Sequence, residues 1–419
     1  MNDKFIIGGG HRLNGTVRVP SAKNACLPLL AASILTQKSV TINNISYFSD
    51  IHKMCDILSH LGCKLVCKEQ KIIIDSSNLN CYEIPHDLMK ESRASIFLLG
   101  PLLARLKHAT VTYPGGCDIG ARPIDIHIKG LKNLNANIIE EGDHIIANGD
   151  NMQAGNVEFS FASVGATENI IMTAVLLKGT TKIFNAAREP EIVDLANFIN
   201  TMGGKIYGAG TSTITVEGVN ELTEVEYTPI PDRIITGTYA IMCAVTGGKI
   251  EITNCNSKHI QTLIDKLINS SCNIECISDK IYVQSCGTLK AVKFTETKPY
   301  PGFATDLQAP FMAAMCKAHG TSIIVENLYE MRYKHASDFV SMGADIEIVD
   351  RTAIIRGVKN LYGTEVYARD LRGAAALVTA GLCAEGTTTI DNISVVDRGY
   401  DQLELRLRAL SADIKRVSV

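Results

Sequence analysis

A unit of about 70 residues repeats six times along the chain, and this repeat constrains the fold more than any other feature. In each copy an apolar stretch runs into a short strand of β-branched residues, as in "NIIMTAVLLKGTTKIFNAA" and "YAIMCAVTGGKIEITNCN". Equivalent positions at the starts of these strands are spaced 66 to 72 residues apart. They are Lys38, His108, Gly179, Gly248, Gly320 and Gly386. Such a fixed period is typical of chains built from one supersecondary unit.

The hydrophobic pattern also predicts what the unit contains. The recurring strand is followed by an amphipathic stretch and two short strands, as in "EIVDLANFINTMG", "GKIYGAG" and "STITVEG". With a strand such as "GTVRVP" leading in, the unit is strand, helix, strand, helix, strand, strand. The last copy lacks its second closing strand, whereas the chain begins with an unassigned strand, "KFIIGG". We therefore expect the N-terminal strand to complete the sixth unit.

The length of the chain indicates two domains of an α/β fold. A chain of 419 residues exceeds what a single core usually holds. Three units per domain place one domain at residues 1–19 plus 231–419 and the other at residues 20–230. A cleft between two such domains is a natural place for a ligand, and rigid-body closure is the expected motion.

Composition excludes several classes of protein. With 46% hydrophobic residues, 20% charged residues and a net charge of -3, we expect neither a nucleic-acid binder nor an acidic tail protein. No run approaches the roughly 18 apolar residues of a membrane span, so we expect a cytoplasmic protein without membrane helices. Its 13 cysteines are scattered through expected helices and strands, so disulfides are not expected. The pairs Cys63 with Cys67 and Cys272 with Cys276 lack further ligands at zinc spacing, so no metal site is expected.

One loop, "YPGGCDIGARP" at residues 113–123, stands out because three glycines and two prolines exclude a regular helix or central strand. Cys117 lies in its middle. A reactive, exposed thiol and an inert, buried one are equal alternatives on the loop alone.

Other polar motifs occur once each, at expected strand-to-helix junctions. "PSAKNACLP" puts Lys23 and Asn24 where a helix N-terminus suits a phosphate, the alternative being a solvated lysine beside a capping asparagine. Asp306 begins a strongly apolar helix, where it could equally be an N-cap. His127 alone would more often be a structural histidine. Because these residues do not recur in every unit, they favour a catalytic site over a solenoid scaffold that binds a partner along its surface.

Several arginines precede expected helices, where their charge opposes the helix dipole unless an anion is bound. Together with Lys23 they would hold more than one phosphate or carboxylate. These residues are Arg93, Arg122, Arg332, Arg372 and Arg398, and Asp125, Asp370 and Asp397 lie in the same stretches.

Taken together, "SAKNACLPLLAAS", "PGGCDIGARPIDIHI", "SVGATENI", "AAREPEIVD", "PDRIITGT", "TDLQAPF", "DLRGAAAL" and "DRGYD" closely resemble the UDP-N-acetylglucosamine 1-carboxyvinyltransferases. This enolpyruvyl transferase family opens peptidoglycan synthesis, and the similarity runs from about residue 4 to the C-terminus. The resemblance implies two inside-out α/β barrels, each of three βαβαββ units. It also implies transfer of the enolpyruvyl group of phosphoenolpyruvate to the 3′-hydroxyl of UDP-N-acetylglucosamine, without a metal or organic cofactor.

The resemblance assigns roles to single residues. Cys117 would be the general acid, Asp306 the base, and Lys23, Arg122 and Arg398 the groups that hold the phosphate and carboxylate of phosphoenolpyruvate. Asn24 would keep the substrates in register. The remaining positions that match substrate contacts are Arg93, Arg122, Pro123, Ile124, Asp125, Ile126, His127, Ser163, Val164, Gly165, Leu328, Arg332 and Arg372.

Two positions depart from the family pattern. Phe161 stands where some relatives have a lysine near the diphosphate, and Val395 stands where many have a histidine. Neither removes a group that the reaction requires. The alternatives are the related enolpyruvyl-shikimate-phosphate synthase, which the cysteine and the G-A-R-P run disfavour, and a catalytically silent binding paralogue.

Overall fold

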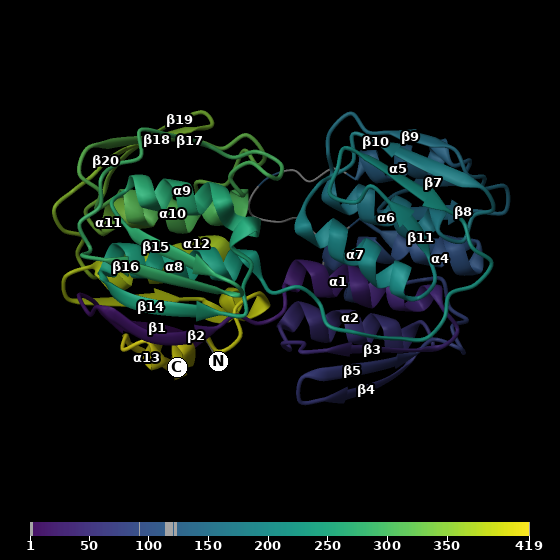
Figure 1. Cartoon of the computed structure of the whole chain (residues 1–419), viewed down its shortest axis with the longest axis horizontal. Coiled ribbons are helices and arrows are strands. Elements are labelled where there is room, and N and C mark those ends of the chain that lie inside the picture. Colours follow the sequence, from purple (N-terminus) through teal and green to yellow (C-terminus); the bar gives the residue numbers. More distant parts are fainter. Residues whose placement is uncertain (1–2, 92, 114–119, 121–123, 419) are drawn as a thin grey trace. The chain divides into compact units, whose positions relative to one another are not determined.

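The computed structural model describes residues 3–91, 93–113, 120 and 124–418. They divide into two compact units (Figure 1). The first unit contains residues 3–20, Gly120 and residues 231–418, and the second contains residues 21–113 and 124–230. The first unit therefore holds both described ends of the chain.

Two contiguous segments show the repeating unit complete. Each contains a four-stranded sheet in which the first two strands are parallel and the last two are antiparallel to their neighbours. One of these segments lies in the second compact unit. Its elements are β9 (Asn156–Glu158), α6 (Val164–Ala174), β10 (Thr180–Phe184), α7 (Pro190–Thr201), β11 (Lys205–Tyr207) and β12 (Thr213–Glu217). In the first they are β17 (Phe294–Glu296), η4 (Thr305–Leu307), α10 (Gln308–Met315), β18 (Thr321–Val325), α11 (Ala336–Ser341), β19 (Asp345–Val349) and β20 (Thr352–Arg356). The predicted βαβαββ order is confirmed.

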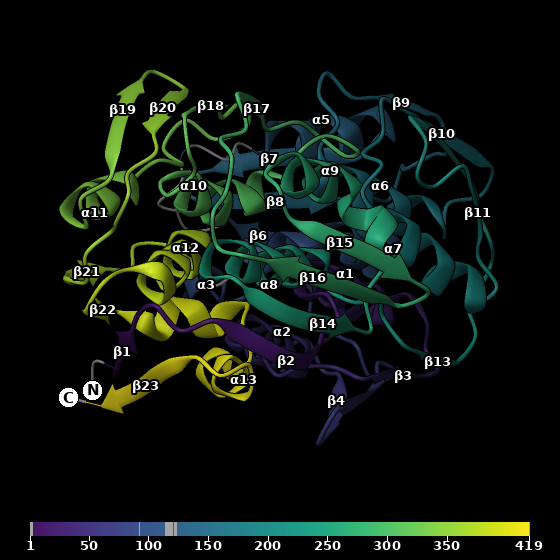
Figure 2. The ribbon, with the colours of Figure 1, turned by 60° about the vertical axis from the view of Figure 1, so that its left-hand side comes forward.

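The N-terminal strand completes the last repeat, as the sequence predicted. Strand β1 (Asp3–Gly8) lies between β22 (Thr387–Asp391) and β23 (Asp413–Ser418) and pairs antiparallel with both (Figure 2). The other elements of this repeat are β21 (Glu365–Tyr367), α12 (Leu371–Cys383), η5 (Ile393–Arg398) and α13 (Leu403–Ala409). The chain thus closes on itself within one sheet.

The strand in "GTVRVP" does not pair with the second strand of the segment that it leads into. This strand, β2 (Leu13–Arg18), pairs parallel with β14 (Gly248–Thr253), and β13 (Val225–Tyr227) takes the matching place beside β3 (Ser39–Asn43). The chain passes between the two units after Pro20 and again after Ile230. These two segments are hydrogen-bonded to each other, from Ala22 N to Ile230 O at 2.8 Å and from Asp232 N to Pro20 O at 2.9 Å. The repeats at the crossings have therefore exchanged their first strands.

The remaining elements follow the same order. With β2 and β14 lie α8 (Arg233–Thr246), η3 (Ser257–Ile260), α9 (Gln261–Asn269), β15 (Asn273–Ile277) and β16 (Lys280–Ser285). With β3 and β13 lie α1 (Lys23–Ala32), η1 (Ser33–Leu35), α2 (Ser49–His60), β4 (Lys64–Lys68) and β5 (Lys71–Asp75). The sixth sheet has three strands, and a single bridge between Glu83 and Thr110 replaces its first strand. Its elements are α3 (His86–Glu91), η2 (Arg93–Leu98), α4 (Leu99–Leu106), β6 (His108–Thr112), α5 (Asp125–Asn133), β7 (Asn137–Glu141) and β8 (His144–Asn148).

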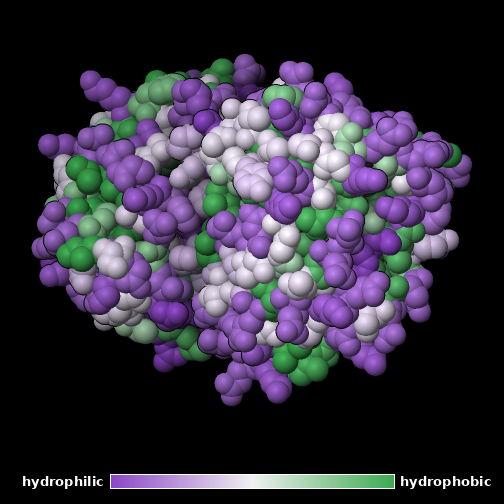
Figure 3. Space-filling view, turned by 45° about the vertical axis from the view of Figure 1, so that its right-hand side comes forward, coloured by the Kyte–Doolittle hydropathy of each residue, from purple (hydrophilic) through white to green (hydrophobic). Residues whose placement is uncertain are grey.

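Within each unit the first helix of each repeat lies in the core and the sheets lie outside (Figure 1). All eight residues of α10 are buried, and in α12 only Leu371 is not. The sheet strands instead alternate buried and more exposed side chains, as in β18. On the face shown in Figure 3, hydrophilic residues surround small, scattered apolar patches. Among the described residues no helix is long and apolar enough to cross a membrane.

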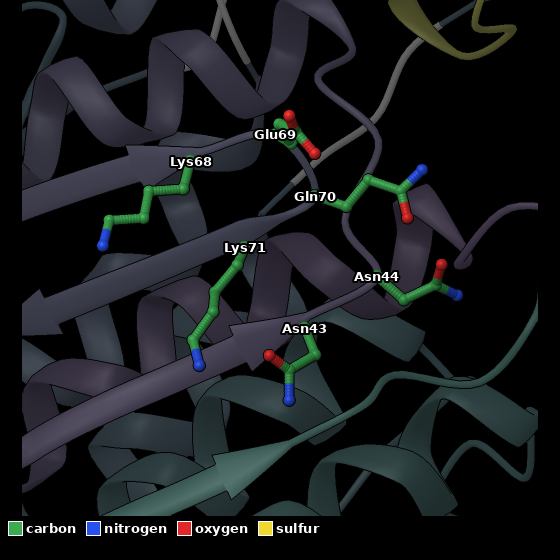
Figure 4. Close-up of a pocket in the computed structure, with 6 residues that line it drawn as sticks. All are labelled: Asn43, Asn44, Lys68, Glu69, Gln70 and Lys71. Carbon is green, nitrogen blue, oxygen red and sulfur yellow. The ribbon is translucent and has the colours of Figure 1, made fainter.

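An asparagine in the left-handed region ends the second strand in four repeats. Asn44, Asn185, Asn254 and Asn392 have φ between 53° and 58°, a conformation that asparagine adopts more readily than most residues. The last three donate a side-chain N–H to the carbonyl of the residue after the first strand, at 2.7 to 2.9 Å. Asn44 instead lies near the β4–β5 turn (Figure 4) and bonds Ser21 Oγ at 3.3 Å. These bonds fix the sheet edge from which the core helices begin.

The closure of the last sheet predicts a large effect of Phe5. Its ring is fully buried and lies 5.2 Å from the Arg416 guanidinium. We expect Phe5→Ala to lower the free energy of unfolding of the first unit by about 3–5 kcal/mol, because it leaves a cavity under β1. The measurement is urea denaturation followed by circular dichroism. The control is Lys4→Ala on the other face of β1, and equal effects of the two variants would contradict this role.

Candidate active site

The predicted site residues whose side chains are described fall into two groups, one on each unit. Cys117, Arg122 and Pro123 lie outside the described residues, as does the side chain of Arg93, the first residue of η2. In the first unit the group comprises Asp306, Leu328, Arg332, Arg372 and Arg398. In the second unit it comprises Lys23, Asn24, Ile124, Asp125, Ile126, His127, Ser163, Val164 and Gly165.

Asp306 does not cap the helix that it precedes. The N-cap position of α10 belongs to Leu307, and no side chain caps it. The Asp306 carboxylate instead accepts hydrogen bonds from Nη2 of Arg332 at 2.7 Å and from Nη2 of Arg372 at 3.2 Å. The two arginine side chains are 3% and 5% exposed, whereas that of Asp306 is 24% exposed. The arginines therefore hold the carboxylate from the protein side and leave part of it accessible.

Arg372 is built into the start of α12. The Asp370 side chain caps this helix by accepting from the backbone N–H groups of Arg372 and Gly373 at 3.0 and 3.1 Å, which offsets the helix dipole. The Arg372 guanidinium lies 5.5 Å from the ring centre of Tyr400. Burial alone lowers the pKa of Arg372, but Asp306 and Tyr400 raise it above its ordinary value. The guanidinium is therefore a permanent positive charge.

Arg332 and Arg372 retain unused donors. Nε of Arg332 and Nη1 of Arg372 are buried and have no hydrogen-bond partner among the described residues. Two guanidinium groups share the Asp306 carboxylate, and Asp232 and Asp370 are further acidic residues near Arg372. Buried N–H donors without partners are unfavourable. An anionic ligand that accepts from these atoms would satisfy them.

Arg398 and its neighbour Asp397 have different surroundings. Asp397 accepts from Nη2 and Nη1 of Arg416 at 2.6 and 3.0 Å and so ties η5 to β23. Arg398 is half-buried at the end of η5. The structure thus gives Asp397 a structural role, and Arg398 ends η5, which lies between β22 and α13.

In the second unit, Lys23 is a buried ion-pair partner and not a solvated lysine. It begins α1 and is 8% exposed, and its Nζ lies 3.1 Å from Oδ2 of Asp50 in the first turn of α2. Asn24 does not cap α1, because Ala22 holds that position. A lysine beside the free backbone donors of a helix N-terminus suits a phosphate. The sequence analysis missed Asp50, since its 27-residue separation from Lys23 leaves no local pattern.

The segments around His127 and Ser163 are brought together by their helices. His127 lies in α5 and is 7% exposed, and its Nδ1 accepts from Nδ2 of Asn169 in α6 at 3.0 Å. Gly165 lies so close to the His127 ring that a Cβ there would approach it to 2.9 Å. Ser163 caps α6 by accepting from Ala166 N at 3.4 Å. Helix α5 begins at Asp125, which is exposed, and Ile124 before it is buried.

A buried acidic residue on α6 was also missed. Glu168 is fully buried, and neither carboxyl oxygen has a hydrogen-bond partner among the described residues. Burial raises its pKa well above the ordinary value, and the carboxylates of Glu191 and Glu189 add to the shift. Phe161, which stands where some relatives have a lysine, is 46% exposed.

One depression on the second unit carries none of the predicted residues. It is lined by Asn43, Asn44 and the turn from Lys68 to Lys71 (Figure 4). Nζ of Lys71 lies 3.3 Å from Oε1 of Glu226. Within the described ranges no group of three or more histidine, cysteine or acidic residues is arranged to hold a metal ion.

His335 makes the stability of the first unit depend on pH. Burial lowers its pKa to about 4, Asp370 opposes this shift and Arg332 adds to it. The unfolded chain takes up this proton near pH 6.5, so the free energy of unfolding falls as the pH falls from about 6.5 to about 4, by up to roughly 3 kcal/mol. His335→Leu should flatten this dependence in urea unfolding. Replacement of the exposed His60 by glutamine is the control, and an unchanged slope in His335→Leu would refute the assignment.

Comparison with known proteins places these groups in context. The family model of EPSP synthase (3-phosphoshikimate 1-carboxyvinyltransferase) matches residues 7–407. A protein of Caldanaerobacter subterraneus subsp. tengcongensis named UDP-N-acetylglucosamine 1-carboxyvinyltransferase 2 is 46% identical over 414 residues, which cover 99% of each chain. A protein of Desulfosudis oleivorans named UDP-N-acetylglucosamine 1-carboxyvinyltransferase is 45% identical over 99% of this chain and 100% of its own.

Solved structures share the fold. The enolpyruvyl transferase NikO from Streptomyces tendae matches with a TM-score of 0.89 and 21% identity over 100% of this chain and 99% of its own. An EPSP synthase from Acinetobacter baumannii matches with a TM-score of 0.77 and 16% identity over 100% of both chains. Full-length identity near 45% is much more specific than these fold matches. The chain therefore belongs to the enolpyruvyl transferases of the EPSP synthase family, and within them to the UDP-N-acetylglucosamine 1-carboxyvinyltransferases.

Proposed function

We propose that the protein transfers the enolpyruvyl group of phosphoenolpyruvate to the 3′-hydroxyl of UDP-N-acetylglucosamine and releases phosphate. This is the first committed step of peptidoglycan synthesis. The observation that carries the proposal is the Asp306 carboxylate, held by two buried arginines at the position that the family resemblance assigns to the base. Identity of 46% with a relative of that name supports the same acceptor.

The reaction requires an acid and a base. The sugar oxygen forms a bond to C2 of phosphoenolpyruvate while C3 takes up a proton, which gives a tetrahedral ketal. Loss of a proton from C3 and departure of phosphate from C2 then restore the double bond. Cys117 donates the first proton, since a thiol with a reference pKa of about 8.5 is mostly protonated at neutral pH. Asp306 accepts the proton of the sugar hydroxyl.

The arginines around Asp306 would also adjust its strength as a base. Without substrate, Arg332 and Arg372 both donate to its carboxylate, and such bonds stabilise the ionised form of a carboxylate. An anionic substrate that accepts from the same guanidinium groups would draw donors away from Asp306. Binding of the anion would therefore strengthen the base when the hydroxyl is in place.

The remaining charges stabilise phosphoenolpyruvate and the ketal. Lys23 is buried, and low exposure strengthens its attraction for a phosphate oxygen. Arg122 and Arg398 complete the set of cations. The contacts of the nucleotide sugar would come from Asn24, Arg93, Leu328 and the segments 122–127 and 163–165. The resemblance indicates that no cofactor is required.

The setting of the reaction follows from its product. A peptidoglycan precursor enzyme would support cell wall biogenesis and, through it, cell shape and cell division. A cytoplasmic location would keep the cysteines reduced. Fosfomycin, an epoxide, would be an inhibitor that alkylates Cys117.

The family model favours a second candidate, transfer to shikimate 3-phosphate, because its description names that reaction. The EPSP synthase structures share only 16–17% identity with the chain and show the fold alone. Phosphate release from phosphoenolpyruvate, measured with each acceptor separately, distinguishes the two. Release only with UDP-N-acetylglucosamine is expected. Binding of the nucleotide sugar without release would identify a silent paralogue.

The acid assignment predicts different outcomes for two replacements of Cys117. Cys117→Ser should lose most turnover or stall at product release, whereas Cys117→Asp should retain activity because a carboxylic acid can also donate the proton. Intact-mass spectrometry should show one fosfomycin adduct on the wild type and none on Cys117→Ser. Replacement of the exposed Cys67 by serine is the control. Full activity of Cys117→Ser, or labelling of another cysteine, would contradict the assignment.

The base assignment predicts that Asp306→Asn lowers kcat roughly 10²-fold or more while the KM values change little. Asparagine keeps the shape of the side chain but cannot take up the proton. Steady-state phosphate release measures both constants. The exposed Asp345, replaced by asparagine, is the control. Equal losses of turnover and of substrate binding would show that Asp306 serves only to position Arg332 and Arg372.

A further inference from the structure

One residue breaks the repeat at the edge where the core helices begin. Four repeats have a left-handed asparagine directly after the second strand, whereas the repeat that contains Asp306 has Glu326 there, directly after β18. In this repeat the next residue, Asn327, makes the equivalent hydrogen bond. Its Nδ2 donates to the carbonyl of Thr297, the first residue after β17, at 3.1 Å. Glu326 thus stands where other repeats have the structural asparagine, while Asn327 makes the structural bond. This indicates a separate role for Glu326.

Glu326 is completely buried and fully hydrogen-bonded. Its relative exposure is 0%. Oε1 accepts from the Thr297 hydroxyl at 2.8 Å and from the backbone N–H groups of Leu328 and Tyr329 at 2.9 and 3.2 Å. Oε2 accepts from the Thr305 hydroxyl at 2.9 Å. A carboxylate that accepts four hydrogen bonds is held in one orientation.

These bonds join three segments that carry the site. Thr305 directly precedes Asp306 in η4, Leu328 is a predicted contact of the nucleotide sugar, and Thr297 directly follows the neighbouring parallel strand β17. The turn that begins at Tyr329 leads to Arg332, which donates to Asp306. The carboxyl ends of parallel strands are where α/β folds bind their ligands. Glu326 is therefore the common acceptor behind both the expected base and an expected substrate contact.

A purely stabilising role does not require a charge here. A buried carboxylate is expensive to desolvate, and an apolar side chain of similar volume often stabilises a core as well. Every hydrogen bond to Glu326 comes from a neutral hydroxyl or amide. An apolar side chain could not orient the donors of three separate segments at once, whereas the Glu326 carboxylate does.

We propose that Glu326 is a positioning residue of the reaction. Through Thr305 it sets the place of Asp306, and through the backbone of Leu328 and Tyr329 it sets the loop that meets the nucleotide sugar. The kinetic meaning of this inference rests on the proposed function. The hydrogen-bond network itself does not, and it is tested separately.

The two branches of the network are separated by paired variants. Glu326→Met removes all four bonds at similar volume, whereas Glu326→Gln keeps one acceptor oxygen and an amide that the Thr305 hydroxyl can meet. Thr305→Val removes only the branch to Asp306, and Thr305→Ser keeps its hydroxyl. Ser322→Ala is the matched control, because Ser322 is also fully buried on β18 and its hydroxyl has no hydrogen-bond partner among the described residues.

Kinetics with both substrates should distinguish positioning from stability. Glu326→Met should lower kcat about 10²-fold and raise KM for UDP-N-acetylglucosamine about tenfold, with KM for phosphoenolpyruvate unchanged, because misplacement by about 1 Å has effects of this size. Thr305→Val should lower kcat alone. Glu326→Gln and Thr305→Ser should recover most of each loss. A lower melting temperature with unchanged constants per folded enzyme, or losses equal to those of Ser322→Ala, would overturn the inference.

Amide hydrogen exchange of the substrate-free protein tests the network without activity. In Glu326→Met, exchange should accelerate in residues 303–308 and 327–333 relative to Ser322→Ala and remain unchanged in the second unit. Unchanged exchange in both segments would overturn the inference whatever the kinetics show. If the wild type releases no phosphate with either acceptor, the proposed function fails, while accelerated exchange would still support the network.

Discussion

Helices with no polar face must be enclosed by other elements, and the rest of this structure depends on that constraint. Helices α10 and α12 are almost entirely buried, so neither is stable with one side in water. One βαβαββ unit cannot cover its own helix, but three units packed around their helices can. The sheets then form the outer layer, and each strand presents one face to the helices and one to the solvent.

In this arrangement the candidate catalytic and binding residues lie near the ends of the strands. The core between the helices is mostly apolar, and most of the predicted site residues lie near the junctions where a strand gives way to a helix. At these junctions backbone N–H groups are unsatisfied, and capping residues such as Asp370 and Ser163 stand beside the functional ones. The repeat thus supplies several equivalent positions, and differences between the repeats, such as Glu326 in place of asparagine, make individual positions specific.

The Asp306 group shows why burial matters for the proposed reaction. Two arginines that are almost completely buried share the Asp306 carboxylate, and each keeps one buried N–H group without a partner among the described residues. An anionic ligand that accepts from these groups would remove an unfavourable arrangement. The buried Lys23–Asp50 pair in the second unit is balanced in charge and holds an ammonium group at the start of α1. Charges of this kind reduce stability in the absence of substrate, which is typical of sites that bind and activate small anionic molecules.

Periodicity in the sequence was sufficient to predict the sixfold repeat, the order of elements and the N-terminal strand that completes the last sheet. It failed at the chain crossings, where β2 and β13 are exchanged, because a strand pattern does not record which neighbour it pairs with. The residue types at the junctions indicated anion binding, since charge and helix position are local properties. Only the tertiary structure decided which side chains contact one another. Asp50 pairs with Lys23, Asp306 pairs with Arg332 and Arg372, and Glu326 joins three segments. Those contacts join residues from different strands and helices, and only the closed packing of the core fixes their distances.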